Sequence, residues 1–250
     1  MSDDAFGAPA VAETHSAWVV FLDDRAYKIK KPVRLDFLDF STRERRERVL
    51  HEELELNRRL APDVYLGVSD VLGPDGLPCE HVLVMRRLPA DRRLSALVEA
   101  GLDVGNEVRA VARVLAAFHS RVATSPQIAA AAAPAAIRAK IERDLDEMDE
   151  FVPHLLDGEC LAEVRRLAVR FLDGRTSLLE ARQASGSVRD GHGDLLADDI
   201  FCMPDGPRIL DCIEFDARLR HGDVLADVGF LAMDLERLGA PELAARLFDW

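Results

Sequence analysis

The sequence predicts an α+β protein with two lobes, a β-rich N-terminal lobe over residues 1–88 and a mostly helical C-terminal lobe over residues 89–250. Strand-like runs of β-branched and aromatic residues dominate the first lobe around one well-marked helix. After Pro89 the apolar residues recur with the period of helices. With 250 residues, 48% of them hydrophobic, the chain is long and apolar enough to bury a core.

The chain is predicted to open with a loose acidic arm at residues 1–13 and a β-hairpin. The segment AWVVFLDDRAYKIKKPV, residues 17–33, contains two strand-like runs joined by a polar turn at Asp23–Arg25. Because side chains alternate along a strand, Lys28 and Lys30 lie on the same face of the second run.

A helix and two further strands complete the first lobe. Ser41 and Glu44 form the capping-box pattern S-x-x-E, which predicts a helix from this point to about Leu60. Apolar runs at residues 61–73 and 81–89 predict the strands.

The second lobe is predicted to be built mainly from helices. His119 lies at the end of an apolar helical stripe and is predicted to be a packed core residue. The predicted elements are helices at residues 105–122, 137–152 and 160–183, strand-like segments at 199–203 and 208–213, and a last helix from about Asp227.

Composition excludes several classes of partner. The chain has 45 acidic and 32 basic residues and a net charge of −13, which argues against nucleic acid because phosphate backbones demand a basic face. No apolar run approaches the roughly 20 residues that span a bilayer. The N-terminus is acidic rather than signal-like, and the four cysteines form no CxxC pair. These features predict a cytoplasmic protein with no membrane partner.

The segment HGDLLADDI, residues 192–200, carries the first chemical motif. Its pattern is His192-x-Asp194-Leu195-x-x-x-Asp199, and the catalytic loop of protein kinases has the spacing H-x-D-L-x-x-x-N. In that loop the Asp positions the acceptor hydroxyl, and the residue five positions on binds Mg²⁺. Asp194 is therefore predicted to be catalytic, and Asp199, with its hard oxygen atoms, to be a metal ligand.

A second metal ligand is predicted on the next strand. In RILDCIEF, Asp211 follows Ile209 and Leu210 at the end of a short apolar strand, where a kinase places its metal-binding Asp. An isolated acid in such a place is costly without a partner, and Mg²⁺ would be that partner. Asp194, Asp199 and Asp211 would then surround magnesium and the phosphates of a nucleotide.

A lysine on a strand and a glutamate on a helix should accompany these acids. Lys28 follows Ala26 on the same face of its strand, as in the V-A-I-K strand of kinases, and Lys30 is the alternative. Glu53 lies in the middle of the apolar stripe of the predicted helix, whereas Glu52 sits at its edge. A carboxylate on a buried face needs a cation, which indicates a pair of Lys28 and Glu53.

The neighbouring polar residues have plainer interpretations. Asp190 and Asp198 are predicted to be solvated loop acids. Glu214 and Asp216 are predicted to form a structural salt bridge with Arg218 or Arg220, and a place in the lining of the acceptor site is the alternative. The segment VLVMRRLP is predicted to lead into a hinge at which backbone groups of Met85, Arg86 and Arg87 pair with adenine.

Taken in order, Lys28, Glu53, VMRRLP, HGDLLADDI and ILDCIEF resemble the aminoglycoside phosphotransferase (choline-kinase-like) family. YKIKKPV, HEELELNRRLAPDVYLGV and DCIEFDARLRHGDVLADVGFLAMDLERLG resemble a bacterial branch of it, some members of which carry a C-terminal P-loop domain. The resemblance covers about residues 14 to 240.

The resemblance implies a two-lobed protein-kinase-like fold, Mg²⁺, ATP or GTP as the phosphoryl donor, and transfer to the hydroxyl of a small molecule. It implies that Asp194 is catalytic and that Asp199 and Asp211 bind the metal. It further implies that His192 orients the loop backbone and that Asp223 and Asp227, in GDVLAD, belong to a segment that braces the loop. Because this chain has no GxxxxGK[ST] motif, a P-loop domain is expected as a possible separate partner protein.

The chain departs from the family pattern HGDLHxxNI in ways that bear on activity. Leu196 replaces the second His, and Asp199 replaces the Asn. ETHSAW stands where a glycine-rich loop is usual, so Thr14–Ser16 would cover the phosphates. The C-terminal lobe is expected to be truncated, because relatives continue with more helices that shape the acceptor site.

These features leave three functions open. The first is an ATP- and Mg²⁺-dependent phosphotransferase acting on an aminoglycoside or amino-sugar-like hydroxyl compound. The second is a degenerate or truncated kinase-fold module that binds nucleotide without transfer. The third is a metal-dependent phosphohydrolase, against which the Lys28 and Glu53 pair argues because a hydrolase does not need it.

Overall fold

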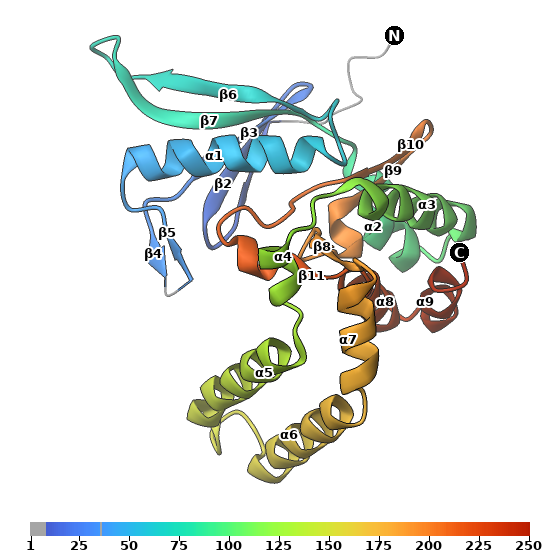
Figure 1. Ribbon diagram of the computed structural model, residues 1–250. Coiled ribbons are helices and arrows are strands. Elements are labelled where there is room, and N and C mark those ends of the chain that lie inside the picture. Colours follow the sequence, from blue (N-terminus) through green and yellow to red (C-terminus); the bar gives the residue numbers. More distant parts are fainter. Residues whose placement is uncertain (1–8, 36) are drawn as a thin grey trace. The chain divides into compact units, whose positions relative to one another are not determined.

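The computed structural model describes residues 9–35 and 37–250 (Figure 1). The chain divides into two compact units. The first contains the residues up to Arg121 together with His192–Ala217 and Asp227–Trp250, and the second contains Val122–Gly191 and Arg218–Ala226. These units are defined by compactness and not by strand or helix content, so the predicted lobe boundary at residue 88 stays a prediction.

Among the described residues, five strands of the first unit form one antiparallel sheet. Their order in the sheet is β1 (Ala10–Glu13), β2 (Ala17–Leu22), β3 (Arg25–Lys30), β7 (Pro78–Arg86) and β6 (Tyr65–Leu72). The predicted hairpin turn lies between β2 and β3. The predicted loose arm is wrong for residues 10–13, which form β1, and the arm's first eight residues lie outside the described ones.

Helix α1 (Arg43–Arg58) packs against β6 and β7 (Figure 1). Its N-cap is Thr42, whose side chain accepts a hydrogen bond from the amide of Arg45, so the predicted cap at Ser41 is wrong by one residue. Ser41 instead donates its hydroxyl to Asp39. The apolar core between helix and sheet contains Leu50, Leu54, Ala61, Val64, Tyr65 and Leu83.

The rest of the first unit consists of short elements around the loop segments that carry the motifs. They are β4 (Arg34–Leu35), β5 (Leu38–Asp39), η1 (Ala90–Arg92), α2 (Leu94–Glu99), α3 (Gly105–Arg121), η3 (Ala197–Asp199), β9 (Ile200–Met203), β10 (Gly206–Ile209), α8 (Leu225–Arg237) and α9 (Pro241–Leu247). Strands β9 and β10 pair as an antiparallel hairpin. The sequence had suggested that Asp211 lies at the end of this strand. Because β10 ends at Ile209, Asp211 lies in the loop after the strand, and that prediction is wrong by two residues.

The second unit is helical, with one short strand pair. Its elements are α4 (Pro126–Ala130), α5 (Pro134–Met148), η2 (Asp149–Phe151), α6 (Gly158–Asp173), α7 (Thr176–Ala184), β8 (Val188–Asp190) and β11 (His221–Asp223), joined through η4 (Ala217–Leu219). The helix predicted over residues 160–183 is broken at Gly174 and Arg175 into α6 and α7. Strands β8 and β11 pair antiparallel.

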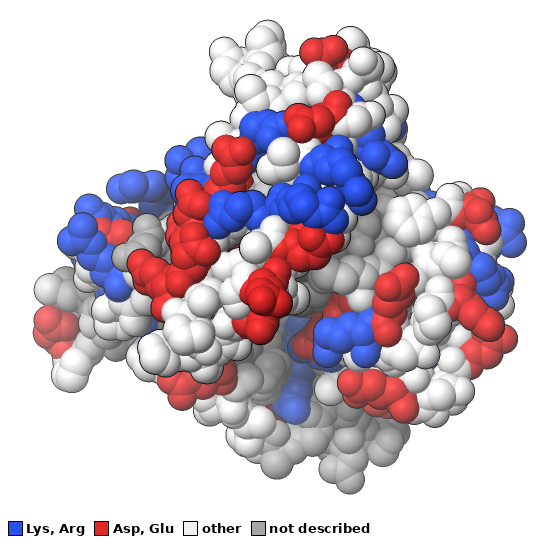
Figure 2. All heavy atoms as spheres, turned by 90° about the horizontal axis from the view of Figure 1, so that it is seen from below, with Lys and Arg blue, Asp and Glu red and all other residues white. Residues whose placement is uncertain are grey.

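Among the described helices, none combines the length and the apolar character needed to cross a membrane. Figure 2 shows Lys and Arg side chains lying next to Asp and Glu side chains over the face that it presents. The surplus of acidic residues is therefore mixed with basic ones on that face.

The core between α1 and the sheet sets the position of the residues discussed below, and its packing can be tested directly. Replacing the fully buried Leu50 by Ala removes apolar contacts and leaves a cavity, which should lower the free energy of unfolding by about 2–5 kcal/mol. Leu72→Ala is the matched control, because that side chain is 61% exposed and its loss should cost within about 0.5 kcal/mol. Urea unfolding measures both, and equal losses would contradict the described core.

Candidate functional site

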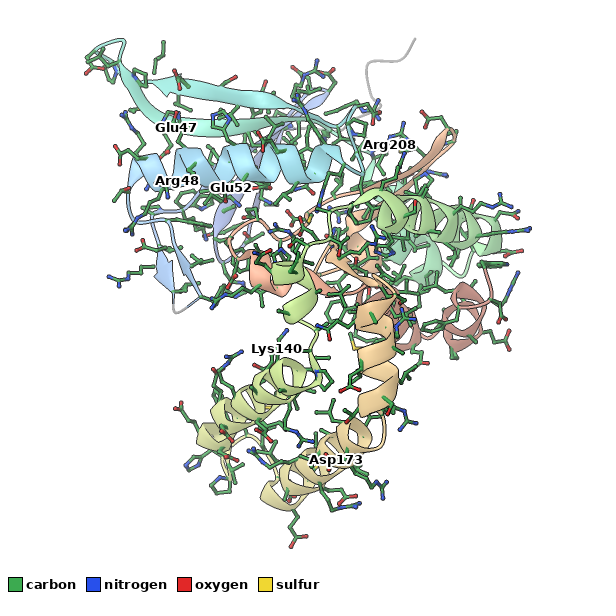
Figure 3. All side chains as sticks on the ribbon, viewed as in Figure 1. Glu47, Arg48, Glu52, Lys140, Asp173 and Arg208 are labelled. Atoms are coloured by element: carbon green, nitrogen blue, oxygen red, sulfur yellow. The ribbon has the colours of Figure 1, made fainter. Side chains whose placement is uncertain are left out.

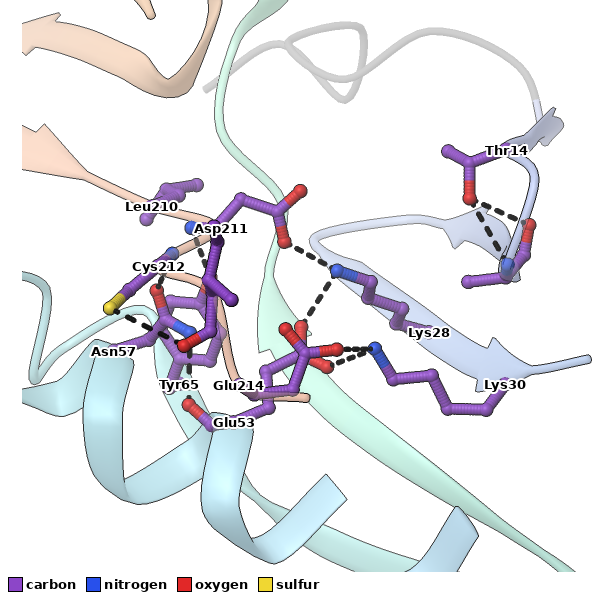
Figure 4. Close-up of polar contacts among 12 residues, drawn as sticks. Thr14, Lys28, Lys30, Glu53, Asn57, Tyr65, Leu210, Asp211, Cys212 and Glu214 are labelled. Carbon is purple, nitrogen blue, oxygen red and sulfur yellow. Dashed lines mark hydrogen bonds and ion pairs between the residues drawn. The ribbon is translucent and has the colours of Figure 1, made fainter. Parts of the chain in front are cut away.

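A buried glutamate of α1 lies between two lysines of β3 (Figure 4). The ammonium group of Lys28 lies 2.7 Å from Oε1 of Glu53, and that of Lys30 lies 2.7 Å from Oε2. The Glu53 side chain is 0% exposed. The predicted pair of Lys28 and Glu53 is present in the structure, and Lys30, predicted as an alternative to Lys28, takes part beside it.

Each lysine also contacts a carboxylate of the loop after β10. Lys28 lies 2.5 Å from Oδ1 of Asp211, and Lys30 lies 2.5 Å from Oε1 of Glu214. Asp211, Lys28, Glu53, Lys30 and Glu214 thus alternate in sign along what we call the ion-pair chain. Glu214 therefore pairs with Lys30, a partner that the sequence did not suggest.

The two ends of the ion-pair chain differ in access to water. The Asp211 side chain is 54% exposed, whereas those of Lys30 and Glu214 are 1% and 8% exposed. The Asp211 end can therefore meet a ligand from solution, and the Lys30 end cannot.

Charge at the ion-pair chain shifts the pKa of each member. Lys28 holds the pKa of Asp211 at about 2. Burial opposes the charge of Lys28, but Asp211 and Glu53 outweigh it and raise the pKa of Lys28 well above its usual value. Burial also opposes the charge of Glu53, and the two lysines outweigh it and lower the pKa of Glu53. At Glu214 burial prevails and raises the pKa. Three carboxylates share two ammonium groups, so negative charge is in excess.

The backbone at Asp211 adopts the left-handed conformation, with φ 63°. Asp and Asn tolerate this region better than other residues with a side chain, and strained backbone often marks functional sites. The amide of Asp211 donates to the Tyr65 hydroxyl at 3.1 Å, and the amide of Cys212 donates to Oδ1 of Asn57 at 2.9 Å. Asn57 also donates to the carbonyl of Glu53 at 2.9 Å, so α1 holds both the glutamate and the Asp211 turn.

The sequence reasoning did not identify Tyr65 or Asn57. Asn57 lies one helical turn after Glu53 and is 1% exposed. A polar side chain on the buried stripe of an otherwise apolar helix face needs a partner, and that was the available signal. Nothing in the sequence pattern marked the Tyr65 hydroxyl.

His192 joins the motif loop to the Asp211 turn. Its Nε2–H donates to the carbonyl of Leu210 at 2.8 Å, and Nδ1 accepts the amide of Asp194 at 3.4 Å. Its own carbonyl accepts the amide of Ile213 at 3.2 Å. Burial lowers the pKa of His192, which keeps the ring neutral and able to accept at one nitrogen while donating at the other. These contacts fit a structural role.

Asp227 of α8 holds the backbone of the same loop. Its two oxygens accept the amides of His192 at 2.9 Å and Gly193 at 3.0 Å. Gly193 has φ 93°, a conformation that favours glycine. The ring of His119 contacts Asp227 at 2.9 Å, so His119, predicted as an ordinary core residue, is the buried partner of that carboxylate. Two helical turns further along α8, the carboxylate of Asp234 accepts a hydrogen bond from the amide of Ala197 at 2.9 Å.

Asp194 and Asp199 carry carboxylates for which no hydrogen bond or ion pair is recorded among the described residues. Asp194 as a whole residue is exposed. Partial desolvation of its carboxyl group and, after it, the charge of Asp211 raise its pKa. Asp199 is half-buried, and burial, then the charges of Asp211 and Asp194, raise its pKa to about 8. The charge of Asp211 thus raises the pKa of both other carboxylates. Such a group calls for a cation.

The described residues contain no group of three or more His, Cys, Asp or Glu side chains arranged to hold a metal ion by themselves. Magnesium does not require one, because it is usually held by one or two carboxylates together with water and substrate phosphates. The donor chemistry of Asp199 and Asp211, two carboxylates with excess negative charge around them, fits that mode of binding.

The predicted hinge lies at the end of β7. The amide of Arg86 donates to the carbonyl of Val64 at 2.8 Å, and the amide of Arg87 donates to that of Asp24 at 2.9 Å. These two amides are therefore already used as donors within the protein. The amide of Leu88 is the next donor along the chain, and no partner is recorded for it among the described residues.

The turn at Thr14–Ser16 joins β1 to β2. The Thr14 hydroxyl accepts the amide of Ala17 at 3.0 Å, and the Thr14 amide donates to the Ala17 carbonyl at 2.9 Å. The ammonium group of Lys31 donates to the Thr14 carbonyl at 2.6 Å. The turn is thus held by its own contacts, and its predicted role over the phosphates stays a prediction.

Other acids of the region are not all where the sequence suggested. Glu52 is exposed on α1 (Figure 3), in keeping with its predicted place at the edge of the buried stripe. Asp198 is 64% exposed, as predicted for a solvated loop acid, and it also contacts the guanidinium group of Arg93 at 2.7 Å and the hydroxyl of Ser95 at 2.8 Å. In the second unit Asp190 is only 16% exposed and pairs with Arg220 at 2.8 Å, so the prediction of a solvated acid is wrong there.

Comparison with solved structures shows that the chain has a kinase-like fold. The chain aligns with the GDP and kanamycin complex of APH(2")-IIia at a TM-score of 0.53 and 17% identity, covering 98% of this chain and 77% of that one. It aligns with the GDP complex of wild-type aminoglycoside 2'-phosphotransferase-IIIa at a TM-score of 0.50 and 15% identity, covering 99% and 79%. The predicted α+β, protein-kinase-like fold is confirmed.

Sequence relatives extend the comparison without naming an activity. The chain is 42% identical over 233 residues to uncharacterized proteins of Mycobacterium tuberculosis and Mycobacterium bovis. The match covers 93% of this chain and 47% of each relative, so the chain spans about half the length of the curated relatives it matches. No family model matches the chain.

The raised pKa of Asp199 predicts how stability depends on pH in the absence of divalent cations. The unfolded carboxyl ionises near its ordinary pKa of about 3.9, and the folded one at about 8. The unfolded state therefore loses its proton first, and the wild-type protein loses stability as pH rises from about 4 to about 8. Asp199→Asn lacks this loss, so its advantage over the wild type should grow by at least about 1.4 kcal/mol, the equivalent of one pKa unit.

Urea unfolding in a chelating buffer at about pH 5 and about pH 9 measures this difference. Asp91→Asn, at an exposed acid of the same unit, should show no such growth. An advantage of Asp199→Asn that is equal at both pH values would contradict the described environment of Asp199.

Proposed function

We propose that this chain is a phosphotransferase of the aminoglycoside phosphotransferase (choline-kinase-like) family. In this proposal it uses Mg²⁺ and ATP or GTP to phosphorylate a hydroxyl group of a small molecule. The ion-pair chain supports the proposal, because the charge at its exposed end, Asp211, raises the pKa of both Asp194 and Asp199 within a kinase-like fold.

The residues divide into those that hold phosphate and those that act on the acceptor. Lys28 pairs with Glu53 and with Asp211. In this proposal Asp211 exchanges Lys28 for the metal ion, and Lys28 then neutralises phosphate oxygens. Asp199 and Asp211 would hold Mg²⁺, which when bound neutralises charge on the phosphates and orients them. A glutamate that holds the lysine and an acid that holds the metal are the parts that phosphoryl transfer needs.

Asp194 would receive the proton of the acceptor hydroxyl. As the hydroxyl oxygen forms its bond to the terminal phosphorus, the bond from that phosphorus to the bridging oxygen of the donor breaks, and the nucleoside diphosphate leaves. The exposure of Asp194 gives an acceptor access to it, and the raised pKa makes it a better base than an ordinary Asp. The amides that Asp227 holds at His192 and Gly193 keep the loop in place.

The classes of donor and acceptor rest on the structural neighbours. One neighbour is a complex with GDP and kanamycin, and another is a complex with GDP. They support a purine nucleotide and an aminoglycoside or amino-sugar-like acceptor for this chain. The excess of carboxylates at the site is compatible with a cationic acceptor. A separate P-loop domain protein stays a proposed partner.

Calorimetric titration with ATP and GTP, with and without Mg²⁺, together with transfer of labelled phosphate to a panel of aminoglycosides and amino sugars, tests the proposal. The wild-type protein should bind one of the nucleotides in a magnesium-dependent manner and label an acceptor. Asp194→Ala should keep nucleotide binding and lower transfer by about 100-fold or more, because it removes the proton acceptor alone.

Asp91→Ala, at an exposed acid of the same unit, is the matched control and should transfer as the wild type does. Transfer retained by Asp194→Ala would remove that residue from its role. Magnesium-dependent binding with no labelling of any acceptor would favour a nucleotide-binding module without transfer. A folded chain that binds neither nucleotide would contradict the proposal.

A further inference from the structure

Lys30 is a second lysine of β3 that takes no part in the chemistry proposed above. Its side chain is 1% exposed, and its ammonium group contacts Glu53 at 2.7 Å and Glu214 at 2.5 Å. The ring of Phe40 lies 5.4 Å from Nζ. A lysine buried in this way does not reach a nucleotide from solution, so it acts through its two carboxylate partners.

Glu214 ties the Asp211 turn to β3. It lies three residues after Asp211, and its neighbour Phe215 packs against Phe37 with ring centroids 5.5 Å apart. The amide of Cys212 is held by Asn57, as described above. The segment Asp211–Phe215 is thus attached to β3, to α1 and to the loop between β4 and β5.

Lys28 and Lys30 each contact one oxygen of Glu53, and this division decides which other carboxylate Lys28 can contact. Glu53 is 0% exposed and must keep its positive partners, whereas Asp211 is 54% exposed and can be solvated by water. If Lys30 were absent, both oxygens of Glu53 would depend on Lys28. Lys30 forms an ion pair with one of these oxygens and so leaves Lys28 able to contact Asp211.

We propose that Lys30 and Glu214 form a second, buried lysine–glutamate pair that positions the metal-binding turn. The pair holds Asp211 at the open end of the ion-pair chain before nucleotide and magnesium arrive. Lys30 and Glu214 are positioning residues, since neither is placed to touch substrate. This inference rests on the proposed function for its consequence in magnesium binding, but the ordering of the turn is a property of the free protein.

Two variants of the pair and one control test the inference. Lys30→Met keeps the length of the side chain and removes its charge, and Glu214→Gln keeps the shape and weakens the pair. Arg46→Met is the matched control, because Arg46 is a cation of α1 in the same unit, is 9% exposed and pairs at 2.5 Å with Glu80, which belongs to β7 and not to the turn. All three lose a buried ion pair, so all three should lose some stability.

The first readout is amide hydrogen exchange in the free protein. The amides of Cys212 and Ile213 are hydrogen-bonded to Asn57 and His192 and should exchange slowly in the wild type. In Lys30→Met and Glu214→Gln they should exchange about tenfold faster, while the amides of β6 and β7 change little. In Arg46→Met the turn should stay protected.

The second readout is the magnesium dependence of nucleotide binding by calorimetry. Lys30→Met should raise the magnesium concentration needed for half-maximal binding about tenfold, a shift of the size seen for coupled neighbours. Binding without magnesium should change little. The double variant should lose no more than either single one, since the two residues act as one pair.

The outcomes separate this inference from the proposed function. Unchanged exchange at the turn in Lys30→Met, or equal loosening in Arg46→Met, overturns the inference whether or not nucleotide binds. If the turn exchanges faster only in Lys30→Met and Glu214→Gln, but the wild-type protein binds no nucleotide, the proposed function is overturned and the positioning pair is supported. Selective loosening together with the magnesium shift supports both.

Discussion

A carboxylate buried away from water must be met by positive charge, and Glu53 is the point at which this requirement organises the site. Its two oxygens face Lys28 and Lys30, and each lysine in turn contacts an acid of the loop after β10. Helix α1, strand β3 and the Asp211 turn are joined by these contacts. If Glu53 were neutral, the two lysines would lose the partner that places them side by side.

Most of the fold was accessible from the sequence because its signals are local. The hairpin turn after β2, the strands β6 and β7 and the helix α1 follow from alternation, turn residues and an apolar stripe. The errors concern where helices begin and end: the cap is Thr42 because the Ser41 hydroxyl bonds to Asp39 instead, and a predicted helix is broken at Gly174 and Arg175.

The site was predicted in part for the same reason. Burial of Glu53 and its contact with Lys28 follow from periodicity and the cost of an unpaired charge. The pairing of Glu214 with Lys30 could not be read from spacing, since 184 residues separate them and closer arginines were available. The left-handed turn at Asp211 and its support from Tyr65 were equally hidden, because no local pattern encodes a hydrogen bond from the Asp211 amide to a hydroxyl 146 positions earlier in the chain.

The most direct test of this account is the magnesium-dependent binding of nucleotide by Glu53→Gln, measured by calorimetry beside Glu55→Gln. Glu55 lies on the exposed side of the same helix, so both variants lose one charge from α1. With circular dichroism showing that both are folded, Glu53→Gln should lose the magnesium-dependent part of binding, and Glu55→Gln should bind as the wild type does. Equal binding by the two variants would contradict the claim that Glu53 organises the site.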